Sequence, residues 1–353
     1  YVDQDRAKGR GLLRDSIREA EGADTHDEDA RHARTYSYTS LILDAAKEGD
    51  YDGALRLFGQ ELGFDAPDRC VLALTEDTER VLLVARGADG GTLGHYEGAR
   101  SRRLREELTG VVPARMLAAL GGCEQVRVLA RAPLQGRSGL LPEGFAWSYW
   151  TRSEQPKPVV ARPVHLVVTD VAYDVARKLK PLSWTPSFGP AEQRRVLRGA
   201  EATPSRVLGE MVEATEIDLA THGLISPVSD ASYLVLAKES GPNGTDELRS
   251  RFIREAKLKG APLVLLAACN AGRAAPVLRE PVSLSNAFLE AGARAVISAT
   301  KPIPDQESST FFAGLRERLR AGASPAAALR DERQVWMQQG RGTGWIESVL
   351  LFE

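Results

Sequence analysis

Residues 262–272 read PLVLLAACNAG, an apolar run of strand length that ends at Cys269 and is followed by Gly272. A strand that is apolar at every position is buried on both faces, which is typical of a parallel sheet covered by helices on two sides. Further strand-like segments alternate with helical patterns along the same part of the chain. We expect strands at 164–169, 216–221, 233–237, 262–268, 293–299 and 348–352. We expect helices at 190–198, 204–214, 246–257, 282–291, 307–321 and 325–337. The alternation predicts a three-layer α/β fold with a mainly parallel sheet and right-handed crossovers.

Two of these strands end in residues with chemical reactivity. IDLATHG, at 217–223, places His222 and Gly223 just beyond one strand, and Cys269 lies just beyond another. The carboxyl ends of parallel strands meet at one edge of a sheet, so a thiol and an imidazole can face each other there. His222 precedes Cys269 by roughly the 50 residues that separate the pair in caspases. The sequence therefore predicts a dyad in which a thiolate attacks while the imidazole serves as base and then as acid, with the N–H groups of Gly223 and Cys269 as oxyanion donors.

The same residues have a plainer interpretation. A cysteine after an apolar strand is most often an inert core residue, and a histidine at a strand end is often only hydrogen-bonded. The occurrence of both, in this order and in one α/β unit, favours the dyad. A non-catalytic interaction scaffold remains the main alternative. A nucleotide-binding enzyme is disfavoured because neither G-x-G-x-x-G nor a P-loop follows the first strand.

The first part of the chain, residues 1–67, is predicted to be helical. TYSYTSLILDAAKEGDYDGALRLFGQELGFDAP, at 35–67, contains two helical patterns broken at Gly49 and Asp50. This segment resembles one tetratricopeptide repeat, and because a single repeat cannot bury its own faces, more repeats are expected upstream.

A second unit, residues 68–155, has the periodicity of short strands. Its strands are expected at 70–74, 80–86, 92–96, 125–130 and 145–150, with a helix at 113–120. A proline-rich connector at 152–163 leads to the α/β unit, residues 156–353.

Composition excludes several classes of protein. The chain has 353 residues, enough for two domains, and a formal net charge of −2, which argues against nucleic-acid binding. The sequence contains no run of 18 apolar residues, the length that would suggest a membrane span. The three cysteines are few and widely spaced, so Cys70 and Cys123 are expected to be ordinary buried thiols of a cytoplasmic protein. The remaining histidines lack ligand spacing, so neither a metal nor another cofactor is expected. Because the chain begins at Tyr1 with no leader pattern, we interpret it as a fragment of a longer protein.

Residues 196–352 resemble the CHAT family, caspase-like cysteine peptidases in the clan of caspases and separases. The resemblance rests on VLRGAEAT (196–203), IDLATHG, LVLLAACNAG, SNAFLEAGARAVISATKPIPD (285–305), AGASPAAALRDER (321–333) and GWIESVLLFE (344–353). It implies a caspase-like sandwich made of a degenerate first half, residues 68–155, and a catalytic second half, residues 156–353. It also implies that His222 and Cys269 are the peptidase dyad and that Gly223 helps to form the oxyanion hole. Tetratricopeptide repeats upstream are usual in this family.

One departure from the family concerns the substrate pocket. Relatives usually carry Leu-Trp after the strand at 295–299, a region beside the substrate, where this chain has Thr300 and Lys301. Relatives that cut after Arg or Lys place a carboxylate in the S1 pocket, and Asp170 and Asp305 are the candidates here. A helix cap or a solvated loop acid is the plainer interpretation of both. Ala268 stands where some of those relatives carry an acid, so an apolar P1 residue stays open.

The resemblance implies a function. It is that of a cysteine endopeptidase gated by upstream repeats, which cleaves a partner protein after a sensor partner binds. Bacterial relatives act in antiviral defence or programmed cell death, on gasdermin-like proteins or other dedicated partners.

Overall fold

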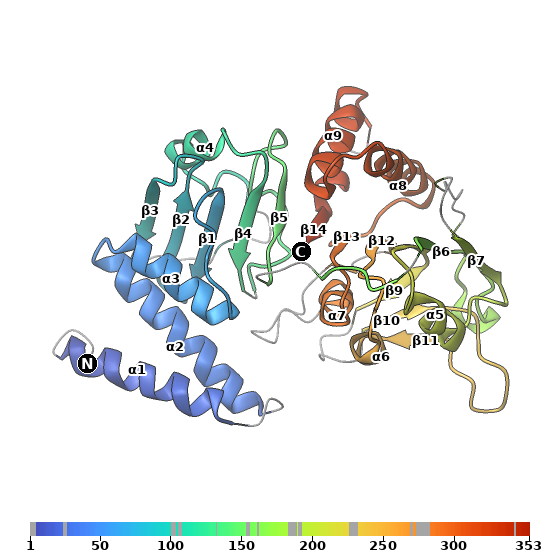
Figure 1. The fold of residues 1–353 in the computed structure, drawn as a ribbon, viewed down its shortest axis with the longest axis horizontal. Coiled ribbons are helices and arrows are strands. Elements are labelled where there is room, and N and C mark those ends of the chain that lie inside the picture. Colours follow the sequence, from blue (N-terminus) through green and yellow to red (C-terminus); the bar gives the residue numbers. More distant parts are fainter. Residues whose placement is uncertain are drawn as a thin grey trace.

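The computed structural model describes residues 5–23, 27–99, 104, 108–131, 133–152, 156–160, 162–182, 189, 193–225, 232–268, 271–272, 283–341 and 344–353. One 11-stranded sheet runs through it in the order β3-β2-β1-β4-β5-β14-β13-β12-β8-β6-β7 (Figure 1). The neighbours are parallel except at β3–β2, β2–β1 and β14–β13. The predicted α/β architecture with a mainly parallel sheet is confirmed.

The described residues of the N-terminal part form four helices and one end of this sheet. The helices are α1 (Arg6–Glu21), α2 (Glu28–Lys47), α3 (Tyr51–Leu62) and, after the first strands, α4 (Ala114–Leu120). The strands are β1 (Val71–Glu76), β2 (Val81–Arg86), β3 (Thr92–Glu97), β4 (Val126–Ala130) and β5 (Trp147–Tyr149). The chain turns between α2 and α3 at Gly49, whose φ of 79° lies in the left-handed region that favours glycine.

The C-terminal part forms the rest of the sheet and a small second sheet. Its strands are β6 (Val164–Val171), β7 (Gln193–Gly199), β8 (Glu216–Ala220), β9 (His222–Leu224), β10 (Tyr233–Val235), β11 (Glu247–Arg249), β12 (Leu263–Ala267), β13 (Ala295–Ala299) and β14 (Val349–Phe352). Its helices are η1 (Val175–Arg177), α5 (Pro204–Met211), α6 (Ser250–Glu255), α7 (Leu284–Glu290), α8 (Asp305–Arg320), α9 (Pro325–Gln338) and η3 (Ile346–Ser348). The second sheet has the order β11-β10-β9.

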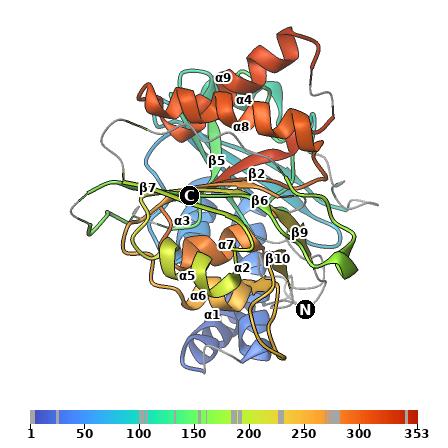
Figure 2. The same cartoon turned by 90° about the vertical axis from the view of Figure 1, so that its right-hand side faces the viewer.

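Helices cover both faces of the large sheet. Alternate strand residues such as Val264 and Val296 pack in one core with Phe288 of α7, and their neighbours Leu265 and Ile297 pack in another with α8 and α9. Figure 2 shows α8 and α9 on one side of the sheet and α5, α6 and α7 on the other. At the other end of the sheet, α2 and α3 pack on one face and α4 on the opposite face, and α1 packs on α2 (Figure 1). The three-layer prediction is therefore confirmed.

The two parts of the sheet meet in the middle, between β5 and β14. Phe352 pairs with Tyr149, whose ring stacks on it at a centroid distance of 5.7 Å. The backbone N–H of Glu353 donates to the Tyr149 carbonyl at 2.8 Å, and Thr151 donates back to Glu353 at 2.7 Å. One continuous sheet therefore joins the two parts of the chain.

Two expected helices are wrong, wholly or in part. Residues 193–198 of the helix expected at 190–198 belong instead to β7, which pairs with β6 at the edge of the sheet, and residues 190–192 lie outside the described residues. Charged side chains are typical of an edge strand, and the arginines of QRRVLRG serve there instead of on a helix surface. The helix expected from residue 246 begins only at Ser250, because Glu247–Arg249 pairs with β10 as a strand.

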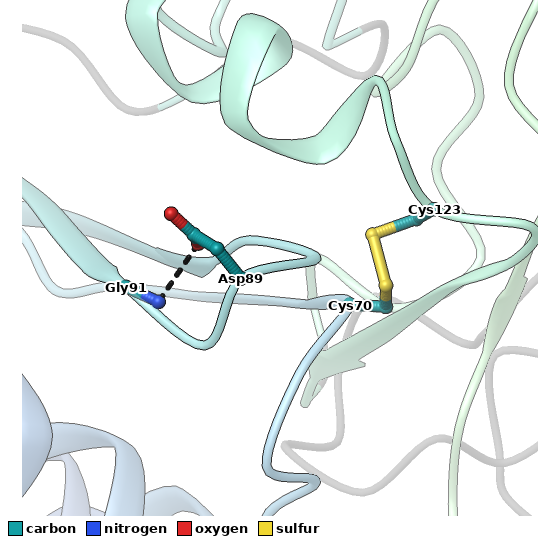
Figure 3. The surroundings of a disulfide bond; sticks show 4 residues. All are labelled: Cys70, Asp89, Gly91 and Cys123. Atoms are coloured by element: carbon teal, nitrogen blue, oxygen red, sulfur yellow. Dashed lines mark hydrogen bonds between the residues drawn. A yellow bond between two sulfur atoms is a disulfide. The ribbon is translucent and has the colours of Figure 1, made fainter.

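The expectation that Cys70 and Cys123 are free thiols is also wrong. The two half-buried cysteines form a disulfide, with their Cα atoms 5.6 Å apart (Figure 3). It links the residue before β1 to the loop after α4, because the parallel pairing of β1 with β4 brings these segments together. Sequence spacing alone does not reveal that contact, since 53 positions separate the two residues.

The described helices were also compared with the requirements of a membrane span. None of them combines the length and the apolar character needed to cross a bilayer.

Candidate active site

His222 lies at the carboxyl-terminal edge of the large sheet. It follows β8 by two residues, and β8 pairs in parallel with β12, Ala220 lying opposite Ala267. Cys269, the predicted nucleophile, lies outside the described residues. In the sequence it follows Ala267 by the same two residues by which His222 follows Ala220. The strand register therefore brings the ends of β8 and β12, which the two residues of the predicted dyad follow in the sequence, to the same level of the same edge.

The described residues around Cys269 are held tightly. Ala268 is buried, and the N–H of Gly272 donates to the carbonyl of Ala299, at the end of β13, at 3.0 Å. A Cβ atom on Gly272 would lie 2.6 Å from Ser298 Oγ and 3.1 Å from Thr300 Cγ2. Glycine is therefore required here, because any side chain would push the segment that follows the cysteine away from β13.

A backbone carbonyl orients the ring of His222. Nε2 lies 2.9 Å from the carbonyl oxygen of Lys180, in the loop that follows β6. A carbonyl can only accept, so Nε2 carries the hydrogen and, in the neutral ring, Nδ1 keeps its lone pair. The ring is half-buried. This arrangement leaves Nδ1 as the atom that can accept a proton.

Tyr173 packs beside the same imidazole. Its ring centroid lies 5.2 Å from that of His222, and its hydroxyl lies 3.2 Å from Thr221 Oγ1. Thr221 in turn donates to the carbonyl of Val235 on β10, so the phenol donates to the threonine. Burial raises the pKa of Tyr173, although its hydrogen bonds with Thr221 and with the His222 backbone oppose this effect. Tyr173 therefore stays protonated and fixes the residue just before the histidine.

Gly223 belongs to the small sheet. Gly223 pairs with Leu234, and His222 pairs with Val235. The backbone of both residues is therefore held by the pairing of β9 with β10. Gly223 is half-buried, as is His222. The oxyanion role predicted for Gly223 also depends on Cys269, which lies outside the described residues.

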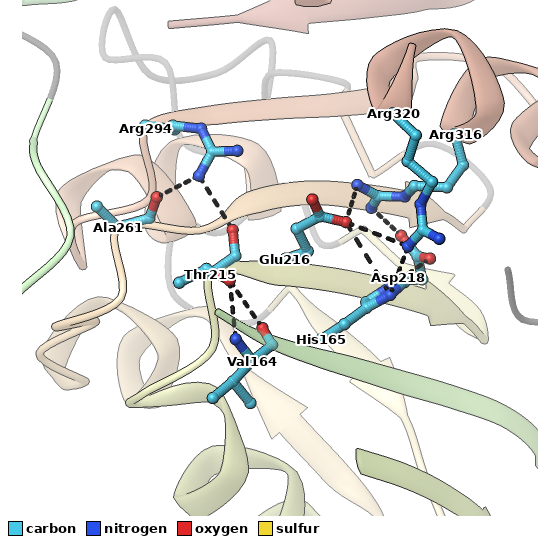
Figure 4. A network of polar contacts seen from close by, with 9 residues as sticks. All are labelled: Val164, His165, Thr215, Glu216, Asp218, Ala261, Arg294, Arg316 and Arg320. Atoms are coloured by element: carbon cyan, nitrogen blue, oxygen red, sulfur yellow. Dashed lines mark hydrogen bonds and ion pairs between the residues drawn. The ribbon is translucent and has the colours of Figure 1, made fainter. Parts of the chain in front are cut away.

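A buried ionic network anchors β8 below the histidine (Figure 4). His165 Nε2 lies 2.8 Å from Asp218 Oδ2, and Arg320 donates to His165 Nδ1 at 3.1 Å. Arg316 of α8, which is 1% exposed, binds Asp218 and also Glu216, the latter at 2.8 Å. Burial opposes ionisation of Asp218, but the charge of Arg316 and the bond from His165 outweigh it and lower its pKa. The network ties β6, β8 and α8 into one unit beneath the candidate site.

Asp170, a predicted S1 acid, lies at the end of β6. Its φ of 51° is in the left-handed region, at the irregularity between Thr169 and Val171. Its N–H donates to the carbonyl of Leu182 at 2.9 Å, and its carboxylate lies 4.0 Å from Arg198 Nε. The backbone of Asp170 thus closes the base of the loop that carries Lys180.

The other predicted substrate-binding residues occupy different environments. Thr300 is buried, and both its N–H and its hydroxyl donate to the carbonyl of Ser348, at 2.8 and 3.2 Å. Lys301 is half-buried and Asp305 is exposed at the first turn of α8. The charge of Asp305 makes a small contribution to the raised pKa of Tyr173, after burial.

Lys180 and Tyr173 are not among the site residues predicted from the sequence. Lys180 acts through its carbonyl oxygen, which every residue type supplies, so no sequence signal could have found it. Tyr173 lies three residues after Asp170, in the loop that leaves a predicted strand, and this position is a usable signal because α/β sites form in such loops. Among the described residues, no cluster of His, Cys, Asp and Glu could hold a metal ion.

The fold and the site together define an α/β protein with a histidine at the carboxyl edge of a mainly parallel sheet, oriented by a backbone carbonyl. The family model described as "CHAT domain" matches residues 151–343, more than half of the chain. The chain belongs to the CHAT domain family. No curated protein sequence matches it significantly.

Two solved structures of the Saccharomyces cerevisiae separase–securin complex are similar to the chain. They align with 12% and 14% identity over 60% and 61% of it, each with a TM-score of 0.38. The chain spans 14% of the length of the separase chain in both cases.

Proposed function

We propose that the chain is the peptidase part of a cysteine endopeptidase that uses Cys269 and His222. The observation that carries the proposal is the register of β8 and β12, in which Ala220 lies opposite Ala267. The Lys180 carbonyl also supports it, because its contact with Nε2 of His222 leaves Nδ1 as the proton acceptor. Membership of the CHAT family is consistent with this chemistry.

The proposed reaction has two steps. In the first, Nδ1 of His222 takes the proton of the Cys269 thiol, and the thiolate attacks the scissile carbonyl. The C–N bond breaks, His222 gives the proton to the leaving amine, and an acyl-enzyme forms. In the second, water attacks the thioester carbonyl and gives a proton to His222. The C–S bond then breaks, His222 returns the proton to the sulfur, and the carboxylic acid product leaves the free thiol. The N–H groups of Gly223 and Cys269 would stabilise the oxyanion in both steps.

Substrate selection is proposed to involve Asp170, Thr300, Lys301 and Asp305. Asp305 is the stronger candidate for a basic P1 residue, because it is exposed at the start of α8, the helix that follows the carboxyl end of β13. Lys301 would favour acidic groups. Thr300 is committed to Ser348, so we assign it to the pocket wall.

The wider role also belongs to the proposal. We propose that residues 35–67 are a tetratricopeptide repeat, that residues 68–155 are a degenerate half and residues 156–353 the catalytic half of one peptidase unit. Upstream repeats or a sensor would gate the cleavage of a partner protein, gasdermin-like or otherwise dedicated, in bacterial antiviral defence or programmed cell death. The proposed location is the cytoplasm, where glutathione would reduce an accessible disulfide, so the Cys70–Cys123 bond must be measured in protein taken from that compartment.

A peptide library that varies P1 tests the function. Wild-type protein should cleave one class of P1 residue, whereas Cys269→Ala and His222→Ala should not. If turnover survives in Cys269→Ala, the nucleophile is assigned wrongly. If no P1 residue supports turnover, even with upstream repeats and partner present, the non-catalytic scaffold is the better account.

A further inference from the structure

The loop between β6 and the strand that follows it is tied to the candidate base. We call residues 172–182 the histidine loop. Its base is closed where Asp170 N–H and Thr169 Oγ1 both donate to the Leu182 carbonyl, at 2.9 and 3.3 Å. Two residues before Leu182, the Lys180 carbonyl accepts from His222 Nε2. The loop therefore sets the tautomer of the histidine.

The side chain of Arg177, in this loop, forms hydrogen bonds to the small sheet and to the residue directly before β11. Arg177 donates to both oxygens of Asp246, at 2.8 and 2.7 Å, to Glu247 at 3.0 Å, and to the hydroxyl of Tyr233 at 3.1 Å. Bidentate guanidinium–carboxylate pairs fix direction as well as distance. Arg177 lowers the pKa of Asp246, since its hydrogen bonds favour the ionised carboxylate. These four hydrogen bonds hold the Arg177 side chain in place and connect the loop to the small sheet.

The partners of Arg177 lie on strands of the sheet that carries the histidine or, for Asp246, directly before one of them. Tyr233 is on β10, opposite Leu224 of β9, and Glu247 is on β11, opposite Val235. Val235 in turn pairs with His222. The loop that supplies the Lys180 carbonyl is thus bonded to the small sheet, and strand β9 of that sheet carries the imidazole. A second link, from Asp174 to Lys238 at 3.3 Å, is half-exposed and contributes little.

We propose that Arg177 is a positioning residue for the base, holding the histidine loop so that the Lys180 carbonyl keeps the hydrogen on Nε2 of His222. This inference rests on the proposed peptidase function. Without Arg177, Asp246 loses both of its guanidinium hydrogen bonds, whereas Glu247 keeps its pair with Arg249 at 2.8 Å. The loop then loses its main attachment to the small sheet. Nδ1 would then carry the hydrogen in a fraction of molecules, and that fraction could not accept a proton from a thiol.

The test combines a spectroscopic measurement with kinetics. Histidine-selective ¹⁵N labelling and a two-bond ¹H–¹⁵N correlation spectrum report the tautomer of His222, with His222→Gln used to assign its signal. Wild-type protein should show the Nε2–H form, and Arg177→Ala a mixture. On the cleaved peptide, kcat should fall about tenfold to a hundredfold, part of the contribution of a general base, while KM changes little.

Three further variants sharpen the result. Arg177→Lys keeps the charge but loses the bidentate contact, so it should lie between wild type and Arg177→Ala. Asp246→Asn should reproduce the tautomer change, and combining it with Arg177→Ala should add nothing further. Arg195→Ala is the matched control. Arg195 forms an ion pair with Glu210, with a nitrogen–oxygen distance of 2.7 Å, and neither residue belongs to the histidine loop. This control variant should leave both readouts unchanged.

The outcomes separate this inference from the proposed function. A wild-type tautomer and wild-type kcat in Arg177→Ala would overturn the positioning role while leaving the peptidase intact. A tautomer change without peptide cleavage by any form of the protein would support the positioning role and contradict the peptidase.

Discussion

The carbonyl oxygen of Lys180 lies 2.9 Å from Nε2 of His222, although the two residues follow different strands of the sheet. This contact leaves Nδ1 of His222 as the atom that can accept a proton, so the proposed base is oriented by a backbone carbonyl and not by an acidic side chain. The position of that carbonyl depends on how the loop after β6 is attached.

The segment that follows Cys269 should tolerate no side chain at Gly272. Gly272→Ala places a Cβ 2.6 Å from Ser298 Oγ, so we expect a loss of about 1–3 kcal/mol in the free energy of unfolding. Urea denaturation measures this, and peptide cleavage should fall in parallel. Gly209→Ala, on the exposed face of α5 with open space around it, is the control and should gain about 0.5–1 kcal/mol. Equal effects of the two substitutions would contradict the close packing at Gly272.

The buried network should make stability depend on Arg316. Arg316→Met leaves Asp218 and Glu216 without their main counterion, and breaking such a buried pair destabilises a protein by about 3–5 kcal/mol. Arg330→Met breaks a half-exposed pair with Asp331 and should change stability by less than about 1 kcal/mol. A loss below that limit for Arg316→Met, measured by urea denaturation, would contradict the role of the network.

The same network predicts the direction of a pH effect. The folded-state pKa of Asp218 is lowered from its ordinary 3.8, so its ionisation stabilises the fold above that pH. This contribution is lost as the pH falls below 3.8 through the folded-state pKa. Thermal unfolding between pH 7 and pH 3 should therefore be less pH-dependent in Asp218→Asn than in wild type. An identical acid dependence would mean that Asp218 does not contribute.

The disulfide should stabilise the first part of the sheet. It closes a loop across 53 positions, and removing such a bond typically lowers the free energy of unfolding by about 2–4 kcal/mol. We expect that loss in the double variant Cys70→Ser/Cys123→Ser, and in wild type after reduction. The reductant should have no effect on the double variant. Two free thiols in unreduced wild type, found by mass spectrometry, would contradict the bond.

The backbone of Asp170 should matter more than its charge. At a φ of 51°, Asn and Gly are tolerated better than β-branched residues. Asp170→Asn and Asp170→Gly should thus keep stability and cleavage, whereas Asp170→Val should lose both. If Asp170→Asn instead lowers kcat/KM selectively for Arg and Lys at P1, the acid binds the P1 residue and its role as a loop closure is secondary.

Much of the fold follows from the sequence because apolar periodicity is strong in its central strands. The buried runs at β8 and β12 indicated a parallel sheet and placed His222 at its carboxyl edge. Shorter or amphipathic pieces are harder. β9 has three residues and its pairing depends on β10, and QRRVLRG fits a helix face as well as a charged edge strand. The Cys70–Cys123 contact and the Lys180 carbonyl arise only from tertiary packing.

The most direct test of the dyad is the site at which a thiol-reactive peptidyl ketone modifies the unreduced protein, mapped by mass spectrometry. The proposed dyad predicts modification of Cys269 alone, with a rate that falls sharply in His222→Ala because the thiolate is no longer formed by the base. Modification of Cys269 at the wild-type rate in His222→Ala, or equal modification of all three cysteines, would contradict it.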